Sequence, residues 1–407
     1  MAETTDKIKH LWLSNSPHSG SGYGVETRDL LFRFIKAGYD FSCTANYGIE
    51  GYPVNLYGED LIDDRFKGVK LTIYPKMGDQ YGGDALVEHS RNNGFKVAYI
   101  MLDLFAINPQ FLEQLNQMGV KFCPYLPIDQ EPISPGILNN LRYAYKIITF
   151  SQFGQKALEK EGFASHLIPE GIDLEIFKPM DKQKMRDKYG LPQDAFMFGM
   201  VAANKENPPR KSFQQVLEAF ALFYKNHPEA AIFFHSQQNS PAGFPILEYA
   251  RHLGVADRIY FINPYKAVFG ADSKVICEEI NCMDVYLNPS STEGFGMGMV
   301  ESQACGKVVI GNRCQSMPEL VVEGKTGLIC ETDRGWWRNL MGFVYPPNVD
   351  SLYEKMEESF KMAADKDTAD LCRKNIMDNY NIDTLVETKW KVFLDELETE
   401  IAEENKK

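Results

Sequence analysis

The chain alternates twice between short apolar runs and helix-patterned segments. The apolar runs of the first half are IKHLWL, YDFSCTA, KVAYIML, KFCPYLPID and YKIITFS, and those of the second half are FMFGMVAAN, AAIFFHS, RIYFINP, DVYLNPS and KVVIGN. This rhythm of strand and helix is typical of parallel sheets that are covered by helices. A length of 407 residues predicts two or three domains. We therefore expect an α/β protein with two parallel sheets.

A break in the rhythm marks the boundary between the two halves. The stretch HLIPEGIDLEIFKP contains Pro169, Gly171 and Pro179 and has no helical or strand period. It predicts a first domain over 1–168, a linker over 169–180 and a second domain over 181–384. The last segment, 385–407, is expected to form one long polar helix that packs across the domain seam.

Composition limits the classes of binding partner and the cellular location that we expect. There are 43 basic against 56 acidic residues, a net charge of -13, and neither half is basic, which disfavours nucleic acid and anionic membrane surfaces as partners. No apolar run reaches the roughly 18 residues of a membrane span, and the N-terminus has no secretory signal, so the mature chain is expected to start near residue 1. Eight sparse cysteines predict reduced thiols, no zinc cluster and a cytoplasmic protein.

The first glycine loop, GSGYG, follows the first predicted strand and precedes a helix that should end at Gly38. Gly22 and Gly24 are candidates for contact with a donor phosphate, because glycine loops let backbone N–H groups approach anions. The spacing is not GxGxxG, and no acidic residue follows at the distance that an NAD site needs. A plain turn and a phosphate loop both remain open for this segment.

The most informative stretch is NPSSTEGFGMGMVESQACG. Glu293 lies in the loop after a strand, and Glu301 lies in the helix that follows. Gly294 and Gly296 allow backbone N–H groups to approach a ligand at the positive end of that helix. A phosphate held there, with carboxylates that accept hydroxyl hydrogen bonds, would suit a sugar nucleotide. The alternative makes Glu301 an ordinary residue of the helix surface.

A second anchor is the loop VAANKENPPRKSF, in which Arg210 and Lys211 stand just before a helix. Helix N-termini prefer anions, so two adjacent cations there are locally unfavourable unless a diphosphate lies between them. Arginine can bind such a group through two hydrogen bonds and lysine as a point charge. A solvated turn is the competing interpretation.

Together, the EGFG loop, the RK pair, the helix SQFGQKALEKEG and the segment IPEGIDLEIFKP resemble retaining glycosyltransferase family four, most specifically from about Ile147 to Leu328. The resemblance implies the GT-B fold, with two Rossmann-like, doubly wound domains facing across a cleft. It implies that Glu293 faces the donor sugar, that Glu301 binds the ribose hydroxyls, and that Arg210 and Lys211 neutralise the diphosphate leaving group. It also implies backbone contacts to the donor from Phe295 and Gly296.

The chain departs from that family in three places. Many members carry a histidine near the end of the strand KFCPYLPID, where Asp129 is the nearest polar residue here; a sugar or acceptor contact and a turn-forming role are both open. Asn204 stands where the family often has arginine. The aromatic-rich segment GWWRNLMGFVYPP, 335–347, is an insertion whose Trp336 and Trp337 are expected to pack rather than to stack on an acceptor.

The expected reaction follows from these residues and the resemblance. A retaining hexosyltransferase would move a hexose from a UDP- or GDP-sugar to an acceptor hydroxyl, with Arg210, Lys211 and Glu293 as its catalytic residues. No DxD-like motif is present, so we expect neither a metal requirement nor a cofactor beyond the donor itself. The acceptor is expected to be a glycan, a small molecule or a protein, and the sequence leaves the oligomeric state open.

Three rival functions remain. A sugar-nucleotide epimerase could share the architecture, but the seven histidines are scattered along the chain and supply no cluster for proton transfer. An NAD-dependent oxidoreductase is disfavoured by the first glycine loop. A noncatalytic sugar-nucleotide sensor would keep the donor contacts without turnover, so only an assay separates it from an enzyme.

Overall fold

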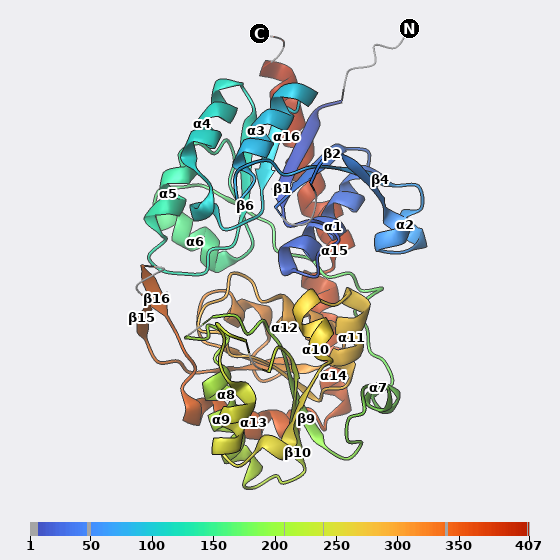
Figure 1. Ribbon diagram of the computed structural model, residues 1–407, viewed down its shortest axis with the longest axis vertical. Helices are drawn as coiled ribbons and strands as arrows, with labels where there is room; N and C mark the ends of the chain where they lie inside the picture. Colours follow the sequence, from blue (N-terminus) through green and yellow to red (C-terminus); the bar gives the residue numbers. More distant parts are fainter. Residues whose placement is uncertain are drawn as a thin grey trace. The chain divides into compact units, whose positions relative to one another are not determined.

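The protein is described from a computed structural model that covers residues 7–46, 50–206, 208–238, 240–337, 341–404 and 406 (Figure 1). The chain divides into two compact units. Unit 1 comprises Met1–Ile128, Ile133–Gly171 and Ile382–Lys407, and unit 2 comprises Asp129–Pro132 and Ile172–Asn381. Each unit has its own sheet with helices packed against it, which confirms the α/β class.

Unit 1 is built on an eight-stranded sheet with the order β3-β4-β2-β1-β5-β6-β7-β8. Only the edge strand β3 is antiparallel to its neighbour. The strands are β1 (Lys9–Ser14), β2 (Asp40–Ala45), β3 (Val54–Tyr57), β4 (Lys70–Tyr74), β5 (Val97–Ile100), β6 (Lys121–Leu126), β7 (Ile148–Thr149) and β8 (His166–Leu167). The α-helices are α1 (Gly22–Lys36), α2 (Gly58–Leu61), α3 (Gly83–Asn93), α4 (Pro109–Gln117), α5 (Pro135–Leu141), α6 (Gln152–Lys160), α15 (Ile382–Leu385) and α16 (Lys391–Glu404).

Unit 2 is built on a six-stranded parallel sheet with the order β11-β10-β9-β12-β13-β14. Its strands are β9 (Phe196–Val201), β10 (Ala230–His235), β11 (Ile259–Phe261), β12 (Val285–Asn288), β13 (Val308–Asn312) and β14 (Gly327–Cys330), with a separate hairpin of β15 (Gly335–Trp337) and β16 (Gly342–Val344). Its α-helices are α7 (Lys182–Tyr189), α8 (Phe213–Tyr224), α9 (Ile246–His252), α10 (Pro264–Phe269), α11 (Ser273–Asn281), α12 (Met297–Ala304), α13 (Val349–Met362) and α14 (Lys366–Asn379).

The central strands are apolar almost throughout because helices cover both faces of each sheet. In β1 every residue after Lys9 is buried, and in β12 all four residues are buried. The predicted first helix is confirmed as α1. Its apolar residues Leu30, Leu31 and Phe34 face the core, and Gly38 follows its C-cap with a φ of +105°, the left-handed region that glycine adopts without steric strain.

The predicted domain boundaries need correction at three points. Residues 169–180 do not form a separate linker: 169–171 belong to unit 1, whereas Ile172 bonds through its N–H to the carbonyl of Tyr380 and belongs to unit 2. Residues 129–132 group with unit 2 although they fall inside the predicted first domain. The segment from Ile382 belongs to unit 1, so the second domain ends before the predicted residue 384.

The C-terminal segment is helical but not one uniform helix. A π-helical turn over Val386–Trp390 separates α15 from α16. Trp390 is fully buried in unit 1, where its ring lies 5.2 Å from Phe34 and 5.0 Å from Tyr125. The segment therefore completes the core of unit 1 instead of being an independent element.

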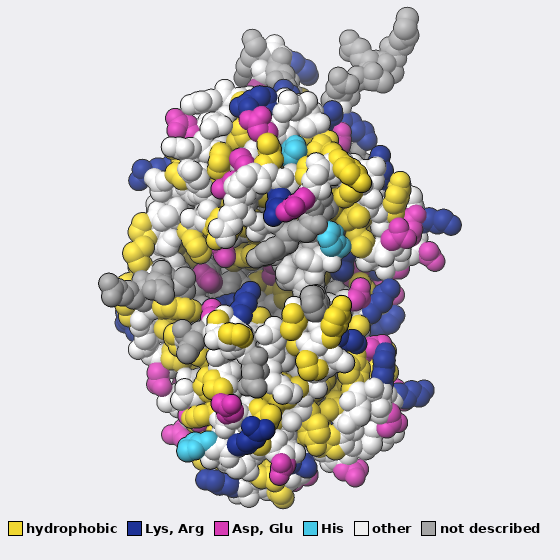
Figure 2. All heavy atoms as spheres, viewed as in Figure 1, with side chains coloured by type: hydrophobic (Ala, Val, Ile, Leu, Met, Phe, Trp, Pro, Cys, Tyr) yellow, Lys and Arg dark blue, Asp and Glu magenta, His cyan; other side chains and the backbone are white. Residues whose placement is uncertain are grey.

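Three observations bear on the sequence predictions about charge, membrane spans and cysteines. Basic and acidic side chains are interspersed over the face drawn in Figure 2. In the described part of the chain, no helix combines the length and the apolar character that crossing a membrane requires. The eight cysteines are all free and buried.

Candidate functional site

The strand order of unit 2 reverses between β9 and β12. β10 and β11 lie on one side of this point, and β13 and β14 lie on the other. Ligands of open parallel sheets bind outside the carboxyl ends of the strands at such a reversal. The loops that leave β9 and β12 there carry Arg210, Lys211 and Glu293, the three residues predicted to be catalytic.

The structure joins these three residues directly. The Lys211 Nζ atom lies 2.6 Å from Glu293 Oε2, and Arg210 Nη1 lies 3.9 Å from Glu293 Oε1. Arg210 also donates a 2.8 Å hydrogen bond to the carbonyl of Thr292. The two loops, 81 to 83 positions apart in the chain, thus form one charged cluster.

The cluster sets the charge state of its carboxylate. Burial by itself would raise the pKa of Glu293, but the charges of Lys211 and Arg210 and the Lys211 hydrogen bond lower it to about 2. The carboxylate is therefore ionised at neutral pH. Burial lowers the pKa of Lys211, and the charge of Glu293 opposes that shift.

The backbone beside the cations is strained. Ser212, the N-cap of α8, has a φ of +56°, which is uncommon for a residue other than glycine. Its side chain makes no capping hydrogen bond to the helix. The cations therefore stand at a helix start whose first N–H groups have no side-chain cap, an arrangement that favours an anion.

The loop from Glu293 to Gly296 is fixed by Ser316. The Ser316 hydroxyl donates to the carbonyl of Glu293 at 3.1 Å and to that of Phe295 at 2.7 Å. Gly296 has a φ of +115°, and a Cβ added there would lie 2.9 Å from Leu320 Cδ1, so both conformation and space require glycine. Gly294 and Phe295 are buried in this loop, and α12 begins directly after it.

Glu301 lies in the second turn of α12 and is partly buried. Burial is the largest cause that raises the pKa of Tyr286 on β12, and the charge of Glu301 is the second. Glu301 is therefore close to β12, the strand that leads to the Glu293 loop, and not on a remote helix surface.

The other predicted residues lie elsewhere. Gly22 and Gly24 are in unit 1, at the first turn of α1. A Cβ at Gly24 would lie 2.2 Å from Ser19 Oγ, whereas at Gly22 it would meet nothing within 4 Å. Gly24 is thus required by the packing of its own turn. The two residues belong to a different unit from the charged cluster.

Asp129 is partly buried and lies in the short segment that groups with unit 2. Its neighbour Glu131 accepts a backbone hydrogen bond from Phe343 of the β15–β16 hairpin. The hairpin base is also tied to the Glu293 loop, since the Tyr345 N–H donates to the carbonyl of Ser291 at 2.8 Å. The predicted insertion therefore links two loops that carry candidate site residues.

The expectation that both tryptophans of this insertion pack is wrong for Trp336. Its side chain is 53% exposed, with only an edge contact to Phe343 at 5.0 Å between ring centroids. The guanidinium of Arg334 covers the Phe343 ring at 3.6 Å. Trp337 is partly buried, and residues 338–340 lie outside the described residues.

Sequence reasoning missed the residues that hold the site loops together. The Asn312 amide donates to the carbonyls of Pro289, Ser290 and Tyr345. Asn204, where the family resemblance led us to look for a charge, instead clamps a loop by donating to the carbonyls of Gln237 and Phe244. A lone asparagine or serine gives no periodic signal, so nothing in the sequence marked these roles.

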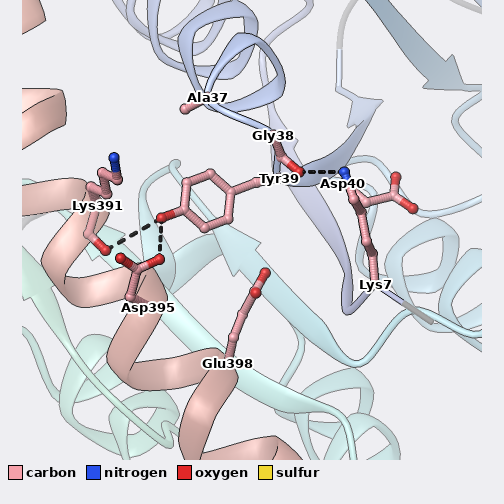
Figure 3. Close-up of a pocket in the computed structure, with 8 residues that line it drawn as sticks. All are labelled: Lys7, Ala37, Gly38, Tyr39, Asp40, Lys391, Asp395 and Glu398. Atoms are coloured by element: carbon pink, nitrogen blue, oxygen red, sulfur yellow. Dashed lines mark hydrogen bonds between the residues drawn. The ribbon is translucent and has the colours of Figure 1, made fainter. Parts of the chain in front are cut away.

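A cavity of about 210 Å³ lies in unit 1, and none of the predicted site residues lines it (Figure 3). Lys7, Tyr39, Asp395 and Glu398 are among the residues that line it, and the Tyr39 hydroxyl donates to Asp395 Oδ1 at 2.5 Å. Its lining mixes two lysines with three carboxylates, and Lys7 donates to the carbonyl of Gly38 rather than to a carboxylate of the cavity. It does not resemble the charged cluster of unit 2.

Residues 181–335 match the family described as glycosyl transferases group 1. These residues form a group 1 glycosyl transferase domain. The segment contains Arg210, Lys211, Glu293 and Glu301. A curated relative, the D-inositol 3-phosphate glycosyltransferase 2 of Catenulispora acidiphila, is 30% identical over 166 residues, which are 39% of this chain and 37% of the relative. The chain thus spans well under half the length of the curated relatives that it matches.

Solved glycosyltransferases share the fold of nearly the whole chain. Sucrose-phosphate synthase from Thermosynechococcus elongatus aligns over 96% of this chain and 99% of its own, with a TM-score of 0.75 and 14% identity. Anabaena HepE in complex with UDP-glucose aligns over 95% and 100%, with a TM-score of 0.66 and 17% identity. The two Rossmann-like units are therefore those of the GT-B fold.

Proposed function

We propose that the chain is a retaining glycosyltransferase that moves a hexose from a UDP- or GDP-sugar to an acceptor hydroxyl without a metal ion. The observation that carries this proposal is the contact of Lys211 and Arg210 with Glu293 at the strand reversal of unit 2. The match to group 1 glycosyl transferases covers the same residues and supports the reaction class.

The donor assignment rests on chemistry that the cluster provides. Two cations and the start of α12 suit a diphosphate, and a carboxylate suits sugar hydroxyls. HepE, which shares the fold, has been solved with UDP-glucose. In the proposed complex Arg210 and Lys211 bind the diphosphate, Glu293 binds the hexose, Phe295 and Gly296 offer backbone contacts, and Glu301 binds the ribose.

The reaction requires the diphosphate to leave while the acceptor hydroxyl attacks from the same face of the sugar. Negative charge grows on the leaving oxygen as the bond breaks. Arg210 and Lys211 are fixed near that position before reaction, so they stabilise the transition state without reorganisation. Glu293 stays ionised because its pKa is low, and it can accept hydrogen bonds from the hexose at neutral pH.

The acceptor in this proposal is a glycan, a small molecule or a protein. The curated relatives carry D-inositol 3-phosphate in their names, so a phosphorylated polyol is the first small molecule to test. Asp129 is a candidate contact to the acceptor or to the sugar.

The test combines binding, turnover and stereochemistry. Thermal shifts with UDP, GDP, ADP, NAD and common sugar conjugates should show stabilisation by one nucleoside diphosphate and its conjugate. Incubation with that donor, an acceptor panel and EDTA should release the diphosphate, and NMR of the product should show the anomeric configuration of the donor. Stabilisation by NAD alone would overturn the proposal, and conversion of the donor sugar without transfer would favour an epimerase.

The ribose role of Glu301 gives a residue-level prediction. Glu301→Ala should weaken binding of the nucleoside diphosphate about tenfold, because one charge-assisted hydrogen bond contributes roughly 1.5–3 kcal/mol, and the melting temperature should stay close to wild type. Isothermal titration calorimetry measures the affinity. Glu358→Ala, at an exposed surface ion pair of the same unit, is the control. An unchanged affinity of Glu301→Ala would refute the ribose role.

A further inference from the structure

Three uncharged side chains around the charged cluster are buried without hydrogen-bond partners. The Ser212 hydroxyl, the Thr292 hydroxyl and both amide atoms of Gln315 have none in the described structure. Ser212 is 1% exposed and Thr292 is 0% exposed. Buried polar groups are nearly always paired in folded proteins, so each exception calls for an explanation.

These residues lie on the loops that hold the cluster. Ser212 follows Lys211, and Thr292 precedes Glu293. The backbone carbonyl of Thr292 accepts a hydrogen bond from Arg210. Gln315 stands between two residues that contact the Glu293 loop. The Cys314 sulfur lies 3.7 Å from the carbonyl oxygen of Ser290, and the Ser316 hydroxyl donates to the carbonyl of Glu293.

Backbone strain occurs at two of the three residues. Among non-glycine residues of the described chain, a positive φ is found at Ser212 (+56°), Gln315 (+41°) and Met341 (+53°). Such conformations persist where the surrounding structure imposes them, and they gather at ligand-binding sites. Strain and an unsatisfied amide thus coincide at Gln315.

The chemistry of the unpaired atoms selects the ligand. A phosphate only accepts hydrogen bonds and would leave the Gln315 amide oxygen unpaired, whereas a cation binds only oxygen atoms and would leave the Gln315 amide N–H groups unpaired. A sugar hydroxyl both donates and accepts, as do the Gln315 amide and the two hydroxyls. We propose that Gln315, assisted by Thr292 and Ser212, binds hydroxyl groups of the donor's hexose and so determines affinity for the sugar part of the donor. This inference rests on the proposed function.

The test replaces the amide with an apolar side chain of the same length. Gln315→Met should bind UDP-glucose, UDP-galactose or GDP-mannose, whichever the wild type prefers, about tenfold more weakly, while UDP or GDP affinity changes less than twofold. Its melting temperature should equal or exceed that of the wild type, because an unsatisfied buried amide is removed. Gln315→Gly should show the same loss of sugar affinity with a higher melting temperature, since it also removes the strain.

The matched control is Gln303→Met in α12. The Gln303 amide is buried and fully engaged, donating to Met299 and Leu320 and accepting from Asn375. Its replacement should lower the melting temperature. If Gln315→Met behaves like this control, or binds the sugar nucleotide as tightly as the wild type does, the Gln315 inference is wrong. If the wild type binds no nucleotide or sugar nucleotide at all, the proposed function itself fails.

Discussion

At the scale of single residues, the proposed reaction depends most on Lys211 and Glu293. Each charge would be unfavourable in its partly buried position without the other. The ammonium group of Lys211, which lies 2.6 Å from the carboxylate of Glu293, can also donate a hydrogen bond to a second anion. The pair thus stabilises the two loops and keeps a cation where the leaving diphosphate would lie.

Removal of this cation should affect turnover more than binding. Lys211→Ala is expected to lower kcat by about 10²–10³ and donor affinity by less than tenfold, because negative charge on the diphosphate grows in the transition state. Steady-state kinetics and calorimetry with the preferred donor separate the two effects. Lys188→Ala, at an exposed ion pair of the same unit, should change neither. Equal losses in kcat and affinity would indicate a binding role alone.

A second residue-scale prediction concerns Glu26, which is fully buried in unit 1. Burial, followed by the charges of Glu170 and Asp29, raises its pKa, while the Gly171 N–H opposes the shift. A raised folded-state pKa means that the folded state holds the proton more tightly than the unfolded state. Stability should therefore fall as the pH rises above about 4.5 toward the folded-state pKa.

Glu26→Gln removes this titration and keeps an oxygen that can accept from the Gly171 N–H. The variant should gain stability over the wild type as the pH is raised from 5 to 8, measured as the difference in urea-unfolding free energies at the two pH values. Glu113→Gln, at an exposed position of α4, should show a flat difference. A Glu26→Gln difference that is equally flat would mean that the carboxyl does not hold a proton in the folded state.

At the scale of elements, α12 depends on its close approach to β12. A Cβ at Gly298 would lie 1.9 Å from the hydroxyl oxygen of Tyr286, which itself donates to the carbonyl of Val201. The glycine therefore brings the start of α12 against the strand that leads to Glu293. This contact orients the helix end that the proposed function uses.

Gly298→Ala should destabilise unit 2 by about 1–3 kcal/mol through overpacking. It should also weaken donor binding, because the start of α12 must move. The double variant with Tyr286→Phe should recover part of the loss. Gly22→Ala, where a Cβ meets open space within a helix, should be neutral or stabilising by up to about 1 kcal/mol in the same thermal unfolding experiment. A Gly298→Ala protein as stable as Gly22→Ala would contradict the packing argument.

At the scale of the whole molecule, the chain crosses from unit 2 back to unit 1 at its C-terminal end. Trp390 fills the aromatic core of unit 1 with Trp12, Phe34 and Tyr125. The segment from Ile382 groups with the first unit, and its Trp390 is part of that unit's hydrophobic core. Loss of this segment should affect unit 1 first.

Trp390→Ala should lower the unfolding free energy of unit 1 by about 3–5 kcal/mol, as expected for a buried tryptophan. Calorimetry, with UDP or GDP added to stabilise unit 2, should show a lowered transition that the nucleotide does not raise. Val392→Ala, 50% exposed in the adjoining helix α16, is the control and should change stability by less than about 0.5 kcal/mol. A uniform loss in both units would contradict the assignment of this segment to unit 1.

The sequence by itself determined the class of the fold and marked the candidate site residues. Continuous apolar runs between helical segments require parallel sheets buried on both faces. Arg210 and Lys211 were predicted from their place just before a helix, and Glu293 from its place in the loop after a strand. The GT-B architecture was implied by the resemblance to retaining glycosyltransferase family four, which is most specific from about Ile147 to Leu328. These features are local in sequence, or nearly so.

Only the tertiary structure decided the rest. Assignment of the C-terminal segment and of residues 129–132 depends on contacts between positions far apart in the chain, which no local period records. The unpaired amide of Gln315 and the loop contacts of Ser316 and Asn312 likewise arise only when strand ends from distant segments meet. Hydrogen bonding and burial depend on which strand ends come together in the folded chain. A sequence that predicts the strands and loops therefore still leaves these contacts undetermined.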